Sequence, residues 1–228
     1  MLAHDISTLE NNGVIFKIVA KPPLLLDLLR SAKEIGGTAR LVVELKAGNN
    51  EASSVLVRLL RRHPDLIERC AVIMSFDAFL MHKLRTELNE LSSSFHADSP
   101  GTIPYENDQG LTLSKIKLPN LLLLTAAKRP TKSFELSVSV TDFSQVDSWL
   151  QHQGRPSLDG VYLQLQPEML EPEGLAALRG LTLKYEVGVW TMPGDLDDFI
   201  TAAHLIEGGG VSYVNTELPR GFIGHGNR

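Results

Sequence analysis

The chain has 228 residues, a formal net charge of −5 and a hydrophobic content of 43%, which is typical of a globular protein with a substantial core. Its acidic balance and the lack of a basic stripe argue against a nucleic-acid partner. The sequence contains neither a signal peptide nor an apolar run approaching the roughly 20 residues that span a bilayer. The single cysteine, Cys70, excludes an internal disulfide and fits a reducing compartment, which favours a cytoplasmic location.

Short apolar, β-branched runs alternate with helical patterns along most of the chain. The expected strands comprise residues 41–46, 71–76, 121–127, 160–166, 184–192 and 211–217. The expected helices comprise residues 24–34, 51–62, 78–91, 146–151, 171–179 and 196–207. Several strand runs are apolar at successive positions, as in strands covered on both faces. This α/β alternation predicts right-handed βαβ units on a parallel sheet.

Three segments fall outside this alternation. Residues 92–119 are polar and rich in Ser, Pro, Gly and Asn, which predicts a long insertion loop. Residues 134–141 alternate and would suit an extra, locally paired strand, and residues 2–4 resemble the end of a further strand. We expect one domain over residues 1–228, with insertions around 92–119 and 128–158.

Glu44 and Lys46 close the apolar run of the first expected strand, where a strand covered on both faces should not end in charges. Period-2 geometry points both side chains to the same side. The carboxyl ends of parallel strands are where α/β proteins bind ligands. A carboxylate there can hold a divalent metal, and the neighbouring ammonium can hold a phosphate. The alternative is that the strand simply ends at Glu44, whose side chain then faces solvent.

Other reactive side chains are expected to be structural. Cys70 directly precedes an apolar strand, which predicts a buried thiol. Asp77 is a plausible N-cap of the following helix, and Ser75 lacks the surroundings of a nucleophile elbow. Six histidines lack metal-ligand spacing and are expected on the surface or in loops, namely His63, His82, His96, His152, His204 and His225.

Six short segments, in the same order along the chain, resemble those of the glycerophosphodiester phosphodiesterase family. They are His4-Asp5 with Thr8-Leu9 and Gly13, residues 23–29, Val43-Glu44-Leu45-Lys46, Ser75-Phe76-Asp77, Val189-Trp190-Thr191-Met192, and Gly210-Val211 with Asn215-Thr216 and Pro219. The resemblance covers most of the chain. It implies a (β/α)8 TIM barrel of the phospholipase C-like phosphodiesterase type. It also implies hydrolysis of small-molecule glycerophosphodiesters to an alcohol and glycerol 3-phosphate, with Mg²⁺ or Ca²⁺ as cofactor.

The resemblance assigns roles to four residues. His4 corresponds to one of two catalytic histidines, and Glu44 to a metal-ligand carboxylate. Lys46 corresponds to a phosphate or substrate contact. Trp190 corresponds to an aromatic wall beside the glycerol moiety, with packing in the core as the alternative. Losing a general acid or base such as His4 costs about 10²–10⁴-fold in rate.

The family's His-Arg-Gly segment and its Glu-x-Asp pair lie upstream of the His-Asp segment, and only three residues precede His4. We therefore expect an incomplete barrel without its first strand, first helix and most of its second strand. Such a fragment would be either a gene model begun at an internal methionine or a piece of a longer protein. A catalytic histidine and two of three metal carboxylates are missing from such a chain. We accordingly expect little or no hydrolysis from it.

Two other functions are open at this stage. One is a non-catalytic barrel remnant that binds a phosphorylated ligand or a protein partner. The other is a phospholipase-type barrel that acts on lipid head groups, which shares the barrel and the histidine chemistry. The sequence gives no indication of the head group or of the oligomeric state.

Overall fold

Strands and helices alternate along the chain as the sequence predicts. The computed structural model describes residues 8–11, 14–17, 24–96, 117–125, 143–190, 194 and 196–216. The strands of the main sheet are β3 (Leu41–Glu44), β4 (Cys70–Ser75), β5 (Asn120–Leu124), β6 (Gly160–Gln164), β7 (Glu186–Trp190) and β8 (Tyr213–Val214). The helices are α1 (Leu25–Ile35), α2 (Ala52–Arg62), α3 (Ala78–His96), α4 (Ser144–Leu150), α5 (Pro172–Thr182) and α6 (Phe199–Ala203). Short helical turns are η1 (Pro64–Arg69), η3 (Pro167–Leu170) and the π-helical η4 (His204–Gly208), which continues α6.

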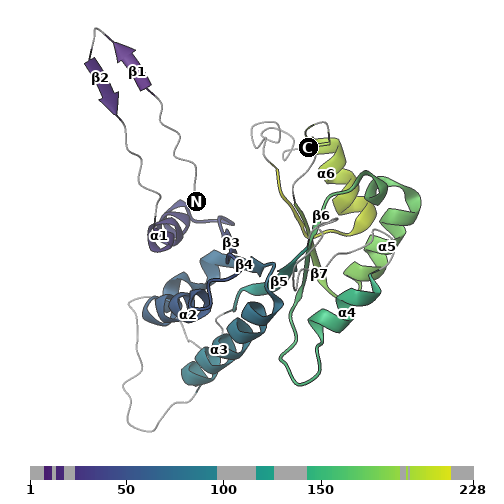
Figure 1. The fold of residues 1–228 in the computed structure, drawn as a ribbon, viewed down its shortest axis with the longest axis horizontal. Coiled ribbons are helices and arrows are strands. Elements are labelled where there is room, and N and C mark those ends of the chain that lie inside the picture. Colours follow the sequence, from purple (N-terminus) through teal and green to yellow (C-terminus); the bar gives the residue numbers. More distant parts are fainter. Residues whose placement is uncertain are drawn as a thin grey trace.

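The six strands form one parallel sheet whose spatial order, β3-β4-β5-β6-β7-β8, is the order of the sequence. Because each new strand is added to the same edge of the sheet, the direction of the connections never reverses. Right-handed connections then place every helix on the same face of the sheet. Figure 1 shows α1 to α3 beside the first strands and α4 to α6 beside the last. The prediction of an α/β fold with a parallel sheet is therefore confirmed.

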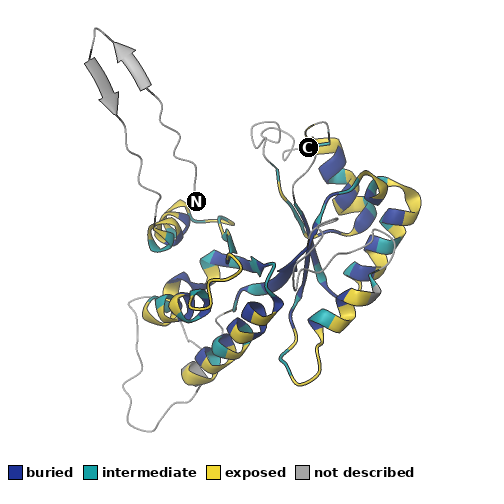
Figure 2. Cartoon of the chain, in the orientation of Figure 1, coloured by how far each residue is buried: buried dark blue, intermediate teal, exposed yellow. Residues whose placement is uncertain are grey.

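The core lies between one face of the sheet and the helices. Strand residues such as Ile73, Leu123 and Val161 are fully buried there against side chains of α1 to α5 and of η4. Figure 2 shows the same division, with buried residues on the strands and on the inward sides of the helices. Each helix carries one apolar stripe, and burying that stripe against a common sheet face is what unites the elements.

The opposite face of the sheet is concave and carries a smaller apolar cluster of its own. The cluster comprises Val72, Leu122, Leu124 and Tyr162, packed with Ala71, Met74, Phe76, Trp190 and Tyr213. Asn120 on β5 and the hydroxyl of Tyr213 on β8 are 3.4 Å apart, although β6 and β7 lie between their strands. Three strand spacings measure about 14 Å along a flat sheet. The contact therefore requires a strongly curled sheet, which has the form of a partial barrel.

Local sequence signals account for several details. The carboxylate of Asp77 accepts the backbone N–H of Leu80 at 3.0 Å, which confirms the predicted N-cap of α3. Ser75 is fully buried and its hydroxyl accepts the N–H of Asp77, as expected of a structural residue. Cys70 is buried as predicted, and burial raises the pKa of its thiol to about 12.

The structure also corrects two expectations and adds one feature that was not expected. Helix α3 continues to His96, so residues 92–96 are helical and do not begin a loop. Strands β1 (Thr8–Asn11) and β2 (Val14–Lys17) form an antiparallel pair that the sequence reasoning did not predict, although an Asn-Gly dipeptide separates the two runs and is a common hairpin signal. His82 is 4% exposed and does not lie on the surface. The expected strands at residues 2–4 and 134–141 fall outside the described residues.

Candidate functional site

Glu44 and Lys46 lie at the carboxyl end of β3 and form an ion pair with Oε1 and Nζ 2.7 Å apart. In the sheet register Glu44 is opposite Met74, which belongs to the concave-face cluster. The two charges therefore share the concave side, as the period-2 argument predicts. The Lys46 side chain is 77% exposed, so its ammonium is accessible to an anionic ligand.

This pair contributes little to stability, because exposed ion pairs gain about 0–1 kcal/mol in water. The location of the pair is more informative than its energy, because an exposed ammonium beside a strand end can bind a phosphate through its positive charge. Glu44 holds that ammonium close to the sheet. The alternative that Glu44 merely ends the strand in solvent does not describe it fully, because its side chain is only 26% exposed and is paired.

The described residues do not by themselves fit a Mg²⁺ or Ca²⁺ site. These cations take six or more oxygen ligands, commonly from several carboxylates. Among the residues with described positions, no group of three or more His, Cys, Asp or Glu side chains is arranged to hold a metal. Glu44 offers one carboxylate, and its Oε1 accepts from Lys46. The metal ligand that the sequence assigns to Glu44 remains a prediction.

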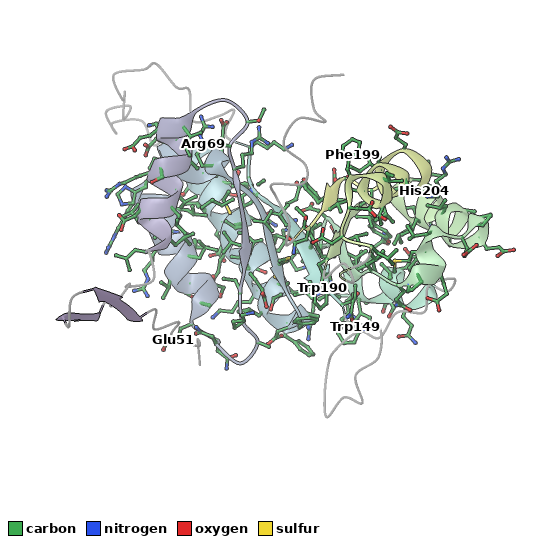
Figure 3. All side chains as sticks on the ribbon, turned by 90° about the horizontal axis from the view of Figure 1, so that it is seen from above. Glu51, Arg69, Trp149, Trp190, Phe199 and His204 are labelled. Carbon is green, nitrogen blue, oxygen red and sulfur yellow. The ribbon has the colours of Figure 1, made fainter. Side chains whose placement is uncertain are left out.

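Trp190, the last residue of β7, lies on the concave face. Its indole Nε1–H donates to the backbone carbonyl of Thr125 at 2.9 Å, and its ring meets the edge of Phe76 with centroids 5.8 Å apart. Figure 3 shows Trp190 near the centre of the molecule. Because the only polar atom of the side chain is already bonded, a ligand would contact the ring by its apolar surface. The aromatic wall that the resemblance assigns to Trp190 stays a prediction.

The structure does not bring the Glu44–Lys46 pair into contact with Trp190. Glu44 on β3 and Trp190 on β7 are separated by three strands, or about 19 Å along the sheet, and curvature shortens that span. No contact between the Glu44–Lys46 pair and Trp190 is present in the described part of the chain. His4 lies outside the described residues.

Sequence reasoning missed Asp197 and gave Thr216 no role beyond its place in the last segment of the resemblance. Asp197 is 6% exposed, and its Oδ1 accepts the hydroxyl of Thr216 at 2.6 Å, just beyond the carboxyl end of β8. The contact fixes the segment that precedes α6 against the last strand. Asp197 stands in the acidic run 195–198, and nothing in the local sequence distinguishes the buried carboxylate from the neighbouring Asp198, which caps α6.

Comparison with family models, with curated proteins and with solved structures finds no significant match to this chain. Within the described residues, no helix is both long enough and apolar enough to cross a membrane.

Proposed function

We propose that the chain binds a glycerophosphodiester on the concave face of its sheet and is related in function to the phosphodiesterases that release glycerol 3-phosphate from such diesters. The observation that carries the proposal is the exposed ammonium of Lys46, which pairs with Glu44 at the carboxyl end of a strand. That strand belongs to a parallel sheet whose strands follow the order of the sequence. In this proposal the curled sheet is part of a TIM barrel of the phospholipase C-like phosphodiesterase type. That architecture collects its ligands at this end.

The proposed roles follow from the chemistry of each side chain. Lys46 binds a phosphate oxygen through its three N–H donors, and Glu44 orients the ammonium. The ring of Trp190 packs against the glycerol carbons. In hydrolysis, a water oxygen forms a bond to phosphorus while the bond from phosphorus to the alcohol oxygen breaks. A base must take the proton from water and an acid must supply one to the alcohol, and His4 is proposed for one of these two transfers.

Binding is tested by fluorescence, because the chain has two tryptophans and Trp149 can be removed. In a Trp149→Phe background, sn-glycero-3-phosphocholine should change the emission of Trp190 in a saturable manner. Lys46→Met should weaken this binding at least about tenfold, because one hydrogen bond to a charged group contributes about 1.5–3 kcal/mol. Lys184→Met is the matched control, since Lys184 is another exposed lysine paired with a carboxylate. Unaltered affinity in Lys46→Met would contradict the placement of the phosphate.

Turnover is tested separately, by enzymatic detection of glycerol 3-phosphate with Mg²⁺, with Ca²⁺ and with EDTA. Metal-dependent release that Glu44→Ala abolishes, with an unchanged circular dichroism spectrum, would support the metal-ligand role of Glu44. Release that persists in Glu44→Ala would exclude that role.

The second candidate function is a non-catalytic barrel that binds a phosphorylated ligand. The ion pair between Glu44 and Lys46 favours it, because a carboxylate paired at 2.7 Å with an ammonium is less available to a cation. Saturable binding without release of glycerol 3-phosphate under any metal condition would establish this alternative. Release of product would exclude it.

A further inference from the structure

We propose that a cavity at the amino ends of the strands binds inorganic phosphate as HPO₄²⁻, at the opposite end of the sheet from Lys46. The cavity has a volume of about 150 Å³. This is the volume of about five water molecules, which gives room for the heavy atoms of a phosphate ion. The inference does not rest on the proposed function, whose ligand lies at the carboxyl ends of the strands.

The residues that line the cavity come from the amino ends of four strands. Arg40 directly precedes β3, and Ala71 is the second residue of β4. Asn120 and Tyr213 are the first residues of β5 and β8, and Lys117 lies three residues before β5. β3 and β8 are the first and last strands of the described sheet, so these residues line one cavity only because the sheet curls.

Two cationic side chains give the cavity its affinity for an anion. The guanidinium of Arg40 has five N–H donors, and the ammonium of Lys117 has three. Neither residue takes part in the ion pairs found within the described part of the chain. Glu68, on η1, contributes the one carboxylate of the lining, so the cations outnumber it. Hydrogen bonds from a cation to a phosphate oxygen are about twice as strong as neutral ones.

Asn120 and Tyr213 add neutral donors deeper in the same cavity. The amide of Asn120 donates from Nδ2 to the hydroxyl oxygen of Tyr213 at 3.4 Å. An amide nitrogen has two N–H groups, and a hydroxyl that accepts a hydrogen bond keeps its own hydrogen. Each of the two side chains can therefore donate to a ligand without giving up the contact between them. Four side chains together surround one tetrahedral anion with donors.

A local irregularity of β4 makes room for the ligand. Leu41 pairs with Cys70, and the next residue, Val42, pairs with Val72. β4 thus carries one extra residue, Ala71, opposite β3. Such a bulge re-aims side chains and is most common at barrel rims and beside binding sites. Ala71 accordingly packs with the concave cluster, and its small methyl group leaves the space that the cavity occupies.

Glu68 determines which oxyanion the cavity prefers. Its carboxylate can only accept hydrogen bonds. HPO₄²⁻ keeps one P–O–H group near neutral pH, which can donate to Glu68 while the other oxygens accept from Arg40 and Lys117. Sulfate has no O–H group at this pH, so its oxygens would repel the carboxylate. A phosphate monoester has lost the same hydrogen, because its second pKa is about 6. The lining therefore favours free phosphate over both.

The first test is isothermal titration calorimetry with sodium phosphate at about pH 7.5, where binding to the wild-type chain should be saturable. Arg40→Met and Lys117→Met should each raise the Kd at least about tenfold, because each removes a charge-assisted hydrogen bond. Arg58→Met is the matched control, since Arg58 is exposed on α2 and lines a different groove. Absence of saturable binding would overturn the proposal, as would equal effects of Arg40→Met and Arg58→Met.

The choice of anion is tested in a Lys46→Met chain, so that phosphate bound at the carboxyl ends does not contribute. Sulfate and methyl phosphate should bind at least about tenfold more weakly than phosphate at the same ionic strength. Glu68→Gln should remove most of this difference, because an amide can donate to an oxygen that has no hydrogen. Equal affinities for phosphate and sulfate with Glu68 in place would show that HPO₄²⁻ is not the preferred ligand.

The location is tested by filling the cavity without changing a charge. Ala71→Leu should abolish phosphate binding and leave the circular dichroism spectrum unchanged. Tyr213→Phe covers the case in which Ala71→Leu does not fold, because it removes one hydroxyl donor and should weaken binding severalfold. Phosphate binding that survives both changes would overturn the proposal. Binding that Lys46→Met abolishes and Arg40→Met spares would also overturn it, since the anion would then lie at the carboxyl ends.

Discussion

The guanidinium of Arg85 and the carboxylate of Asp159 form an ion pair that joins the middle of α3 to the segment entering β6. The same carboxylate oxygen accepts the backbone N–H of Leu121 on β5 at 2.7 Å. Arg85 also donates from Nε to the carbonyl of Ser157 at 3.1 Å. One carboxylate thus ties a helix to two neighbouring strands of the sheet.

Asp159→Asn should lower the free energy of unfolding by about 1–3 kcal/mol, because the amide weakens two charge-assisted hydrogen bonds and leaves Arg85 without its anion. Arg85 is the more buried partner, so its unpaired charge is the main cost. The measurement is urea unfolding followed by circular dichroism. Asp27→Asn is the control, since Asp27 lies in an exposed pair with Arg30 on α1. Equal stability changes in the two variants would contradict the assigned role.

His82 should make stability dependent on pH. Its Nδ1 is 2.7 Å from the carbonyl of Pro156 and its Nε2 is 3.2 Å from that of Trp149. A neutral imidazole can donate to only one of them. Burial, the largest influence, lowers the pKa of His82 below its ordinary 6.5, and the nearby Arg155 also lowers it, while the two carbonyl hydrogen bonds act in the opposite direction.

As the pH falls below 6.5, His82 takes up a proton more readily in the unfolded chain than in the folded one. The free energy of unfolding therefore decreases in this pH range. The contribution of neutral His82 to stability is fully present above the pKa of the unfolded state. It declines as the pH drops toward the lower pKa of the folded state. Unfolding free energies at about pH 7.5 and about pH 5.5 should differ less in His82→Gln than in the wild type. His204→Gln, at an exposed histidine, should keep the wild-type difference.

Gly188 should not tolerate a methyl group. A Cβ at this position would lie 2.4 Å from the ring of Tyr162, on the concave face of the sheet. Gly188→Ala should therefore destabilise the fold by about 1–3 kcal/mol through overpacking. Tyr162→Leu in the same chain should recover part of this loss. Gly180→Ala, on α5, is the control. A Cβ at Gly180 meets no atom within 4 Å, so this substitution should raise the free energy of unfolding by about 0.5–1 kcal/mol.

Trp190→Phe should separate the packing of the indole from its hydrogen bond. Phenylalanine retains an aromatic edge for Phe76 but removes the N–H that Thr125 accepts, which should cost about 1–3 kcal/mol because that carbonyl is left buried. Trp149→Phe provides the comparison. If both variants unfold at the same urea concentration, the bond to Thr125 contributes nothing measurable.

Much of the fold is predictable because its signals are local. Runs such as 121–124 are apolar at every position, since one face meets helices and the other meets the concave cluster. Asp77 also acts within four residues, as a cap on the next helix. The burial of His82 has no such signal, because its partners Trp149 and Pro156 lie on elements more than 60 residues away.

In the candidate site too, some features follow from the local sequence and others depend on residues that are distant in the chain. The sequence placed Glu44 and Lys46 on one side of a strand, because side chains alternate with period two whatever the rest of the chain does. Their ion pair and the exposure of Lys46 depend on what surrounds the strand end. The position of the Trp190 ring depends on Phe76 and Thr125, which are more than 60 residues away in the chain and contact it only in the folded sheet.

The order of strands and helices, the parallel pairing and the side of each charge were determined by the sequence alone, because backbone geometry and apolar periodicity act over a few residues. Only the tertiary structure decided how tightly the sheet curls and which side chains meet on its concave face. Those outcomes depend on packing between residues that are distant in the chain. Curvature, for example, brings Asn120 to Tyr213.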